Sequence, residues 1–185
     1  MKTTNKAYNA ANYAFQADEV ILVDANVWLF LQPPAAQPTP QWAIAYSRVF
    51  ARLLTSKAKP IIDALVLSEY LNRYLRLEYN AAWKESHPDF KAFRQSAGGI
   101  ALAKKAVTDV KHILQLAEPQ DTPLSQTDLP SVLDLLDTGT IDINDGVLIE
   151  SCRLNNWKLL THDADMILGG IDVLTTNKRL LRQCQ

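Results

Sequence analysis

Four carboxylates, placed where short apolar segments end or helices begin, are the residues of this chain best suited to chemistry. They are Asp24, Glu69, Asp145 and Asp163. In a parallel α/β sheet the carboxyl ends of the strands share one edge, where ligands bind. Four acids meeting there would repel one another, so a hard divalent cation is the natural counter-charge. Acids that collect Mg²⁺ or Mn²⁺ beside a cleft indicate phosphoryl-transfer or phosphodiester chemistry.

Two of these acids also have an ordinary structural explanation when each is taken alone. Asp24 follows the apolar run Val20–Val23, where a buried charge needs a partner, but it is also well placed to cap a helix. Asn26, two residues on, is suited to orienting a ligand or a water. Glu69 has Arg73 at i+4, the favourable direction for a solvent-facing ion pair, although Tyr70 and Leu71 beside it suggest the edge of a buried face.

The other two acids lie among competing acids. Asp142, Asn144 and Asp145 all compete to cap the helix expected over residues 144–155, and one cap cannot explain all of them. Asp163 and Asp165 follow an expected strand, where both suit an ordinary turn. Each position alone is a weak signal, and the fourfold recurrence of one arrangement is what favours a common site.

The spacing of apolar residues predicts an α/β protein with a parallel sheet. Strands are expected at 20–23, 60–62, 158–161 and 171–174, and helices at 42–54, after Asp63, at 100–117, after Asp128 up to Gly139, and at 144–155. The Pro-rich segment 33–40, the Gly98-Gly99 pair and the segment 118–125 are expected to interrupt regular structure. Residues 1–18 are expected to form an extension, helical around residues 7–15.

Composition bounds the class of protein. A chain of 185 residues, 48% apolar and 21% charged, is most simply one domain with a sizeable core. No apolar run reaches the roughly 20 residues that span a bilayer, and no signal peptide is evident, so a cytoplasmic location is expected. Cys152 and Cys184 lack a metal spacing, which disfavours a zinc site or a disulfide scaffold. The net charge of −1 neither favours nor excludes nucleic acid.

Together the four positions resemble the PIN domain, the nuclease fold of VapC-type toxins. The family's opening pattern Val-Asp-x-Asn/Ser-x-x-Leu is matched at 23–29, and its helical Glu falls at Glu69. Its Asp-Ala-Leu-Ile helix start is similar to 145–149, and its closing Leu-x-Thr-x-Asp-x-Asp-Phe stretch to 159–166. The chain departs from the pattern at Gly146, where Ala is usual, and at Met166, where an aromatic is usual. The segments 1–18, 33–40 and 80–99 are additional to the small toxins.

The resemblance implies a three-layer α/β/α domain with a central, mainly parallel sheet, covering residues 19–185 after the 1–18 extension. It implies a metal-dependent endoribonuclease in which Asp24, Glu69, Asp145 and Asp163 hold Mg²⁺ or Mn²⁺. The implied partners are RNA, an antitoxin protein and a second copy of the chain in a homodimer, with no membrane association.

Further residues acquire expected roles from the same resemblance. Asn26, Thr161 and Asp165 would orient the metal ligands. The candidate RNA contacts are Arg48, Arg52, Arg73 and Arg76, for each of which a solvated helix face is an equally good explanation. His162 is the one histidine expected near the site.

Several other classes fit the chain less well. A haloacid-dehalogenase-type phosphatase needs Asp-x-Asp after its first strand, and this chain has Asp24-Ala25-Asn26. A receiver domain needs a phosphorylated Asp and a Lys that cannot be placed, and a dinucleotide site needs a Gly-x-Gly-x-x-Gly that is missing. The remaining alternative is a catalytically silent PIN-like module that binds RNA or a protein.

Overall fold

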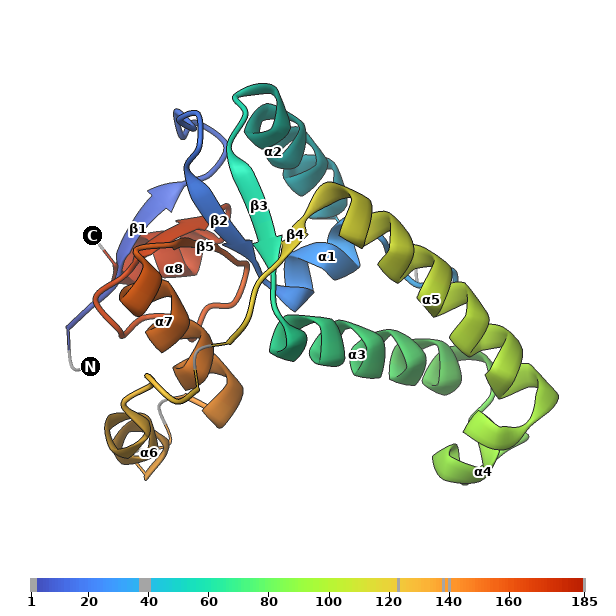
Figure 1. The fold of residues 1–185 in the computed structure, drawn as a ribbon. Helices are drawn as coiled ribbons and strands as arrows, with labels where there is room; N and C mark the ends of the chain where they lie inside the picture. Colours follow the sequence, from blue (N-terminus) through green and yellow to red (C-terminus); the bar gives the residue numbers. More distant parts are fainter. Residues whose placement is uncertain (1–2, 37–40, 123, 138, 140, 185) are drawn as a thin grey trace.

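One sheet of parallel strands organises the molecule, in the order β1-β6-β5-β2-β3-β4 (Figure 1). The computed structural model describes residues 3–36, 41–122, 124–137, 139 and 141–184. The strands are β1 (Lys6–Asn9), β2 (Val20–Val23), β3 (Lys59–Ile62), β4 (Glu118–Pro119), β5 (Lys158–Leu160) and β6 (Asp172–Thr175). The expected α/β class with a parallel sheet is therefore confirmed.

The central strands are buried because their sequences are apolar on both faces, as a parallel sheet covered on both sides requires. Ile21, Leu22 and Val23 of β2 are fully buried, and Leu22 pairs with Ile61 of β3 on one side and Leu159 of β5 on the other. The amide of Asp24 then bonds the carbonyl of Leu160 at 3.0 Å. The residues that follow β2 and β5 are thereby brought to the same edge.

Helices connect the strands. They are α1 (Ala25–Leu31), α2 (Ala43–Thr55), α3 (Ala64–Ala82), α4 (Phe90–Gln95), α5 (Ala97–Leu116), α6 (Leu129–Asp137), α7 (Ile143–Asn155) and α8 (Lys178–Gln183). The long helices α3 and α5 pack together and extend away from the sheet, with α4 at the far end (Figure 1). The segment 80–99 thus forms the tip of a helical arm.

The direction of winding places a switch point between β2 and β5. The chain moves to one edge through β2, β3 and β4, then returns to the middle and moves the other way through β5 and β6. Because crossovers between parallel strands are right-handed, the two halves put their helices on opposite faces. Figure 1 shows α1, α2, α3 and α5 on one side of the strands and α6 and α7 on the other. In such sheets ligands bind at the switch point.

The N-terminal segment differs from the expectation of a helix around residues 7–15. Residues Lys6–Asn9 form the edge strand β1, paired in parallel with β6. Asn5 is buried, and its side chain bonds the carbonyl of Met166 at 3.1 Å and the amide of Ile171 at 3.0 Å. The open edge of β6 offers backbone groups to this segment, and pairing with them outweighs its local helical preference.

The Gly98-Gly99 pair is helical rather than an interruption, whereas the segment 118–125 is a loop as expected after its first two residues, with residue 123 outside the described residues. Gly98 and Gly99 lie in the first turn of α5, capped by Ser96, because α4 and α5 meet so closely that a Cβ at Gly99 would lie 2.1 Å from the carbonyl oxygen of Phe93. The segment 118–125 begins with the short edge strand β4, where a proline is tolerated. In the Pro-rich segment, residues 33–36 lie outside helices and strands, and 37–40 lie outside the described residues.

The expected helix caps are confirmed. Asp63 accepts from the amide of Val66 at 2.8 Å, Asp128 from that of Ser131 at 3.2 Å, and Asp142 from that of Asp145 at 2.9 Å. Gly139 has the positive φ of a helix end. Cys152 and Cys184 are both buried free thiols. Within the described residues, no helix has the length and apolar character needed to cross a membrane.

Candidate active site

A hydrogen-bonded bridge joins the ends of β2 and β5. The Oδ2 atom of Asp24 accepts from the Thr161 hydroxyl at 2.5 Å and from the Asn26 side-chain amide at 2.5 Å. Asn26 also donates to the Thr161 hydroxyl at 3.2 Å and accepts from the amide of His162 at 3.0 Å. The two residues expected to orient Asp24 therefore contact it directly.

Asp24 does not work as a helix cap, although it occupies the capping position of α1. Its side chain makes no capping hydrogen bond and is only 4% exposed. Burial raises its pKa to about 6; the Thr161 hydrogen bond opposes that rise, and the charges of Glu69 and Asp163 add to it. A buried carboxylate in this position is therefore not explained by local structure.

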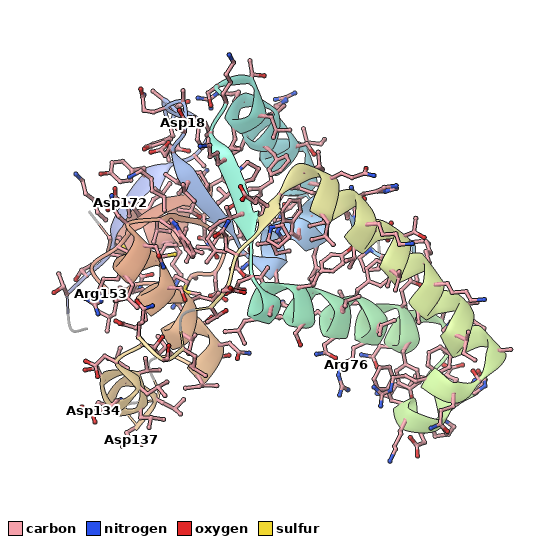
Figure 2. All side chains as sticks on the ribbon, viewed as in Figure 1. Asp18, Arg76, Asp134, Asp137, Arg153 and Asp172 are labelled. Atoms are coloured by element: carbon pink, nitrogen blue, oxygen red, sulfur yellow. The ribbon has the colours of Figure 1, made fainter. Side chains whose placement is uncertain are left out.

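Three further carboxylates are buried among the described residues, and each has a partner: Glu78 accepts from the amide of Ala36 at 3.0 Å. Glu150 forms a two-point ion pair with Arg153, at 2.9 and 2.7 Å, and Figure 2 labels Arg153 on α7. Asp63 uses one oxygen to cap α3 and the other to accept from Thr122 at 2.9 Å. Among the described residues, no Lys, Arg or His lies within ion-pair distance of Asp24, so its partners are neutral. Asp63 and Glu78 also have neutral partners, so what distinguishes Asp24 is that the charges of Glu69 and Asp163 add to the effect of burial on its pKa.

Asp163 is held to the same bridge through its backbone. Its amide donates to the Thr161 hydroxyl at 3.0 Å, and its Oδ1 accepts from the amide of Asp165 at 2.9 Å. The side chain of Asp165 is exposed and lies 3.9 Å from Arg179. Asp165 thus orients Asp163 with its backbone, while its carboxylate faces α8.

Asp145 lies in the first turn of α7 and has no capping task, because Asp142 performs it. Burial first, and then the charges of Asp142, Asp163, Asp24 and Glu69, together raise the pKa of Asp145 to about 7. The pKa of Asp145 therefore responds to the charges of the other three expected ligands. The acids from α3, α7 and the ends of β2 and β5 therefore share an electrostatic environment.

Glu69 forms the ion pair that its spacing predicts, with its carboxylate 2.9 Å from the guanidinium of Arg73. Its side chain is about one-quarter exposed, so it lies at the margin of the group. Within the described residues, no three acidic, His or Cys side chains are close enough together to form a ready-made metal centre. The four carboxylates are neighbours that have not converged on one point.

The donor set fits a hard divalent cation in type and in charge. Carboxylate oxygens are the ligands that Mg²⁺ and Mn²⁺ prefer, and the pKa values of Asp24 and Asp145 are raised by burial first and then by the charges of neighbouring acids. The side chains as they stand show the shared environment and not the coordination.

The four arginines expected near RNA have different surroundings. Arg52 donates to the carbonyls of residues 10, 11 and 13, so its guanidinium anchors the N-terminal segment, and an RNA contact at this position is not supported. Arg48 is exposed on α2. Figure 2 shows Arg76 on the arm, with its side chain toward α4, and its guanidinium lies 4.8 Å from the ring centre of Phe90.

An aromatic cluster around His162 was not expected from the sequence. The rings of Phe30, Trp42 and Tyr46 surround the imidazole, with centroid distances of 5.5, 4.6 and 5.5 Å. The Tyr46 hydroxyl lies 3.0 Å from Nδ1 of His162. Burial lowers the pKa of His162, which keeps the ring neutral near pH 7. Trp42 and Tyr46 have the i,i+4 spacing of an ordinary core stripe, so no sequence signal separated them from the core.

No protein-family model and no curated protein matches the chain. Among solved structures, it is similar to the VapBC2 complex of Rickettsia felis bound to a promoter DNA fragment, with a TM-score of 0.54, 14% identity, and coverage of 84% of this chain and 98% of the other. PAE2754 of Pyrobaculum aerophilum gives a TM-score of 0.48, 18% identity and coverage of 89% and 96%. FitAcB of Neisseria gonorrhoeae gives a TM-score of 0.41 and 17% identity, with coverage of 83% of this chain and 96% of the other.

The first of these similarities shows the fold. The chain has a PIN-like α/β/α fold, with a parallel sheet and helices on both faces. At 14% identity the likeness extends to architecture and not to activity. The acidic group at the switch point of the sheet is seen in this structure and is not inferred from the similar ones.

Proposed function

We propose that this protein is a metal-dependent endoribonuclease of the PIN type, which hydrolyses phosphodiester bonds in RNA with Mg²⁺ or Mn²⁺. The observation that supports it most is Asp24: a buried carboxylate with neutral partners only, at the switch point, under the charges of Glu69 and Asp163. A protein keeps such a charge at a cost in stability, which a bound cation would offset.

In this proposal each residue has a defined task. Asp24, Glu69, Asp145 and Asp163 would hold the cation, which when bound activates a water and neutralises charge on the scissile phosphate. Thr161 and Asn26 keep Asp24 ionised and correctly turned, since both donate to its Oδ2. Arg73 would exchange its bond to Glu69 for one to the RNA backbone, and Arg48 and Arg76 would contact phosphates further along the strand.

A toxin of a toxin–antitoxin pair is the more specific form of the proposal. The similar VapBC2 structure is a complex of that kind bound to promoter DNA. By analogy, this chain would have a protein partner encoded nearby, and would form homodimers. Co-expression with a small DNA-binding protein from the adjacent reading frame should yield a stable complex; independent migration of the two proteins would count against this form.

A catalytically silent PIN-like module is the second candidate, and one observation favours it. Within the described residues the acids have not converged on one point, and Glu69 is already paired with Arg73. The two candidates differ in cation binding. Titration calorimetry with Mn²⁺ should show binding to the wild-type protein and its loss in Asp24→Asn. No heat of binding in either protein would favour the silent module.

A further inference from the structure

The aromatic cluster around His162 is fixed to the acidic group by hydrogen bonds. The carbonyl of His162 accepts from the Asn177 side chain at 2.7 Å, and its amide donates to Asn26, the residue that also holds Asp24. His162 directly precedes Asp163 in the chain. The imidazole therefore has a set position beside the carboxylates, independent of any role in acid–base chemistry.

Within the cluster, Trp42 differs from the other rings in its exposure. Tyr46 is fully buried, whereas Trp42 is 38% exposed and lies with its ring centre 4.6 Å from that of His162, at 38°. Trp42 stands at the start of α2, and its support comes from a side chain at the end of β5. A large, partly exposed aromatic ring thus packs against His162, whose backbone is bonded to the residue that holds Asp24.

We propose that Trp42, backed by His162, is a stacking surface for one unpaired base of the RNA strand whose phosphodiester lies at the carboxylates. The proposal rests on the proposed ribonuclease function and names a part of its substrate site. Single-stranded RNA is recognised largely by stacking of splayed bases on aromatic side chains. A ring beside the scissile phosphate is well placed to hold the neighbouring nucleotide and to fix where the strand is cut.

The chemistry of the surroundings favours a base over an apolar protein segment. The ring is next to a group of acids that would carry a cation and thus attract phosphate, and His162, Asn26 and Asn177 place polar groups around the cluster. The nearby Ile44, 64% exposed on α2, is the feature that a protein partner would use. Coverage by a protein is therefore the competing outcome of the test.

The test compares Trp42→Ala with Trp42→Phe, which keeps an aromatic face, and with Leu54→Ala, an exposed apolar residue at the other end of α2. Binding of a labelled 12-nucleotide single-stranded RNA is followed by fluorescence anisotropy with Ca²⁺, an oxygen-coordinating cation that compensates the carboxylates, and gel electrophoresis of the same samples checks that the strand stays intact. Trp42→Ala should weaken binding by about 5- to 150-fold, the range for loss of one base–aromatic stack. The RNA affinity of Trp42→Phe should stay within about threefold of that of the wild-type protein, and Leu54→Ala should have the wild-type affinity.

The readouts separate this proposal from the nuclease proposal. Wild-type affinity in Trp42→Ala, or no RNA binding by the wild-type protein, would overturn the stacking surface and leave the exposed ring to a protein partner. Trp42-dependent binding without cleavage in Mg²⁺ or Mn²⁺ would leave the stacking surface standing and refute the nuclease. Unchanged melting temperatures in all variants would exclude a merely structural role for Trp42.

Discussion

Asp24 and Asp63 both follow a buried strand and precede a helix, yet they use their oxygens differently. Asp63 caps α3 and accepts from Thr122, so its charge is accounted for by structure. Asp24 makes no cap and accepts from Thr161 and Asn26. Two acids with the same local sequence context thus have separate roles, and the side chains that contact them decide which is which.

Asp145 and Asp142 offer a matched pair for testing the role of charge. Asp142 caps α7, and Asn caps about as well as Asp, so Asp142→Asn should leave activity and stability nearly unchanged. Asp145→Asn should reduce Mn²⁺ affinity and cleavage by more than the roughly 10- to 100-fold typical of residues that only orient a ligand. Calorimetry and a cleavage assay would measure both. Equal losses in the two variants would show that Asp145 has been assigned wrongly.

The stability of the metal-free protein should depend on pH in a defined direction. The pKa of Asp24 is about 6 and that of Asp145 about 7, both above the value of about 4 for an unfolded chain. At these two positions the folded state binds more protons, so their contribution to stability falls as pH rises from about 4 to 7, whereas the lowered pKa of the single residue His162 acts in the opposite direction. The melting temperature in EDTA should be higher at pH 5 than at pH 7.5. Each ~1 kcal/mol of difference in the free energy of unfolding corresponds to about 2–4 °C.

The same measurement has an internal control. Asp24→Asn should make the melting temperature less dependent on pH. Adding Mn²⁺ to the wild-type protein at pH 7.5 should raise its melting temperature, because the cation binds the ionised carboxylates. A wild-type protein more stable in EDTA at pH 7.5 than at pH 5 would contradict the crowding of charges at this site.

At the scale of elements, local signals predicted the strands and caps well, since an apolar run or a capping Asp acts within a few residues. They failed where a distant segment decides the outcome. Strand β1 forms because β6 offers an open edge, and Gly99 leaves room for the carbonyl of Phe93, which lies against the first turn of α5. The bridge between Asp24 and Thr161 follows from the ends of two neighbouring strands, whereas the cluster on Trp42 required the segment after β5 to meet the start of α2.

Gly146, the departure from the family pattern, has a structural explanation in the contact of α6 with α7. A Cβ there would lie 2.5 Å from Cγ1 of the buried Val132. Gly146→Ala should therefore destabilise the protein by ~1–3 kcal/mol, measured by urea unfolding, despite the better helix propensity of Ala. Combining it with Val132→Ala should cost less than the sum of the two single changes. Strict additivity would show that the close approach carries no strain.

At the scale of the whole molecule, the described part of the N-terminal segment, residues 3–18, completes the sheet. They supply β1, the buried side chain of Asn5 and the carbonyls bonded by Arg52. Removing them should expose the edge of β6 and lower the melting temperature; a loss of ~3 kcal/mol corresponds to about 6–12 °C. Lys6→Thr, which keeps a good strand former at an exposed position, is the control and should melt like the wild type. Equal melting of the truncated chain would make this segment dispensable.

The central claim is that the acidic group at the switch point hydrolyses RNA with a bound cation, and one cleavage assay tests it most directly. Purified protein should cut single-stranded RNA with Mg²⁺ or Mn²⁺ and stop in EDTA. Asp24→Asn, which removes charge and little volume, should be inactive while its circular dichroism and metal-free melting remain those of a folded protein. Full cleavage in EDTA, or by Asp24→Asn, would contradict metal-assisted hydrolysis at this site.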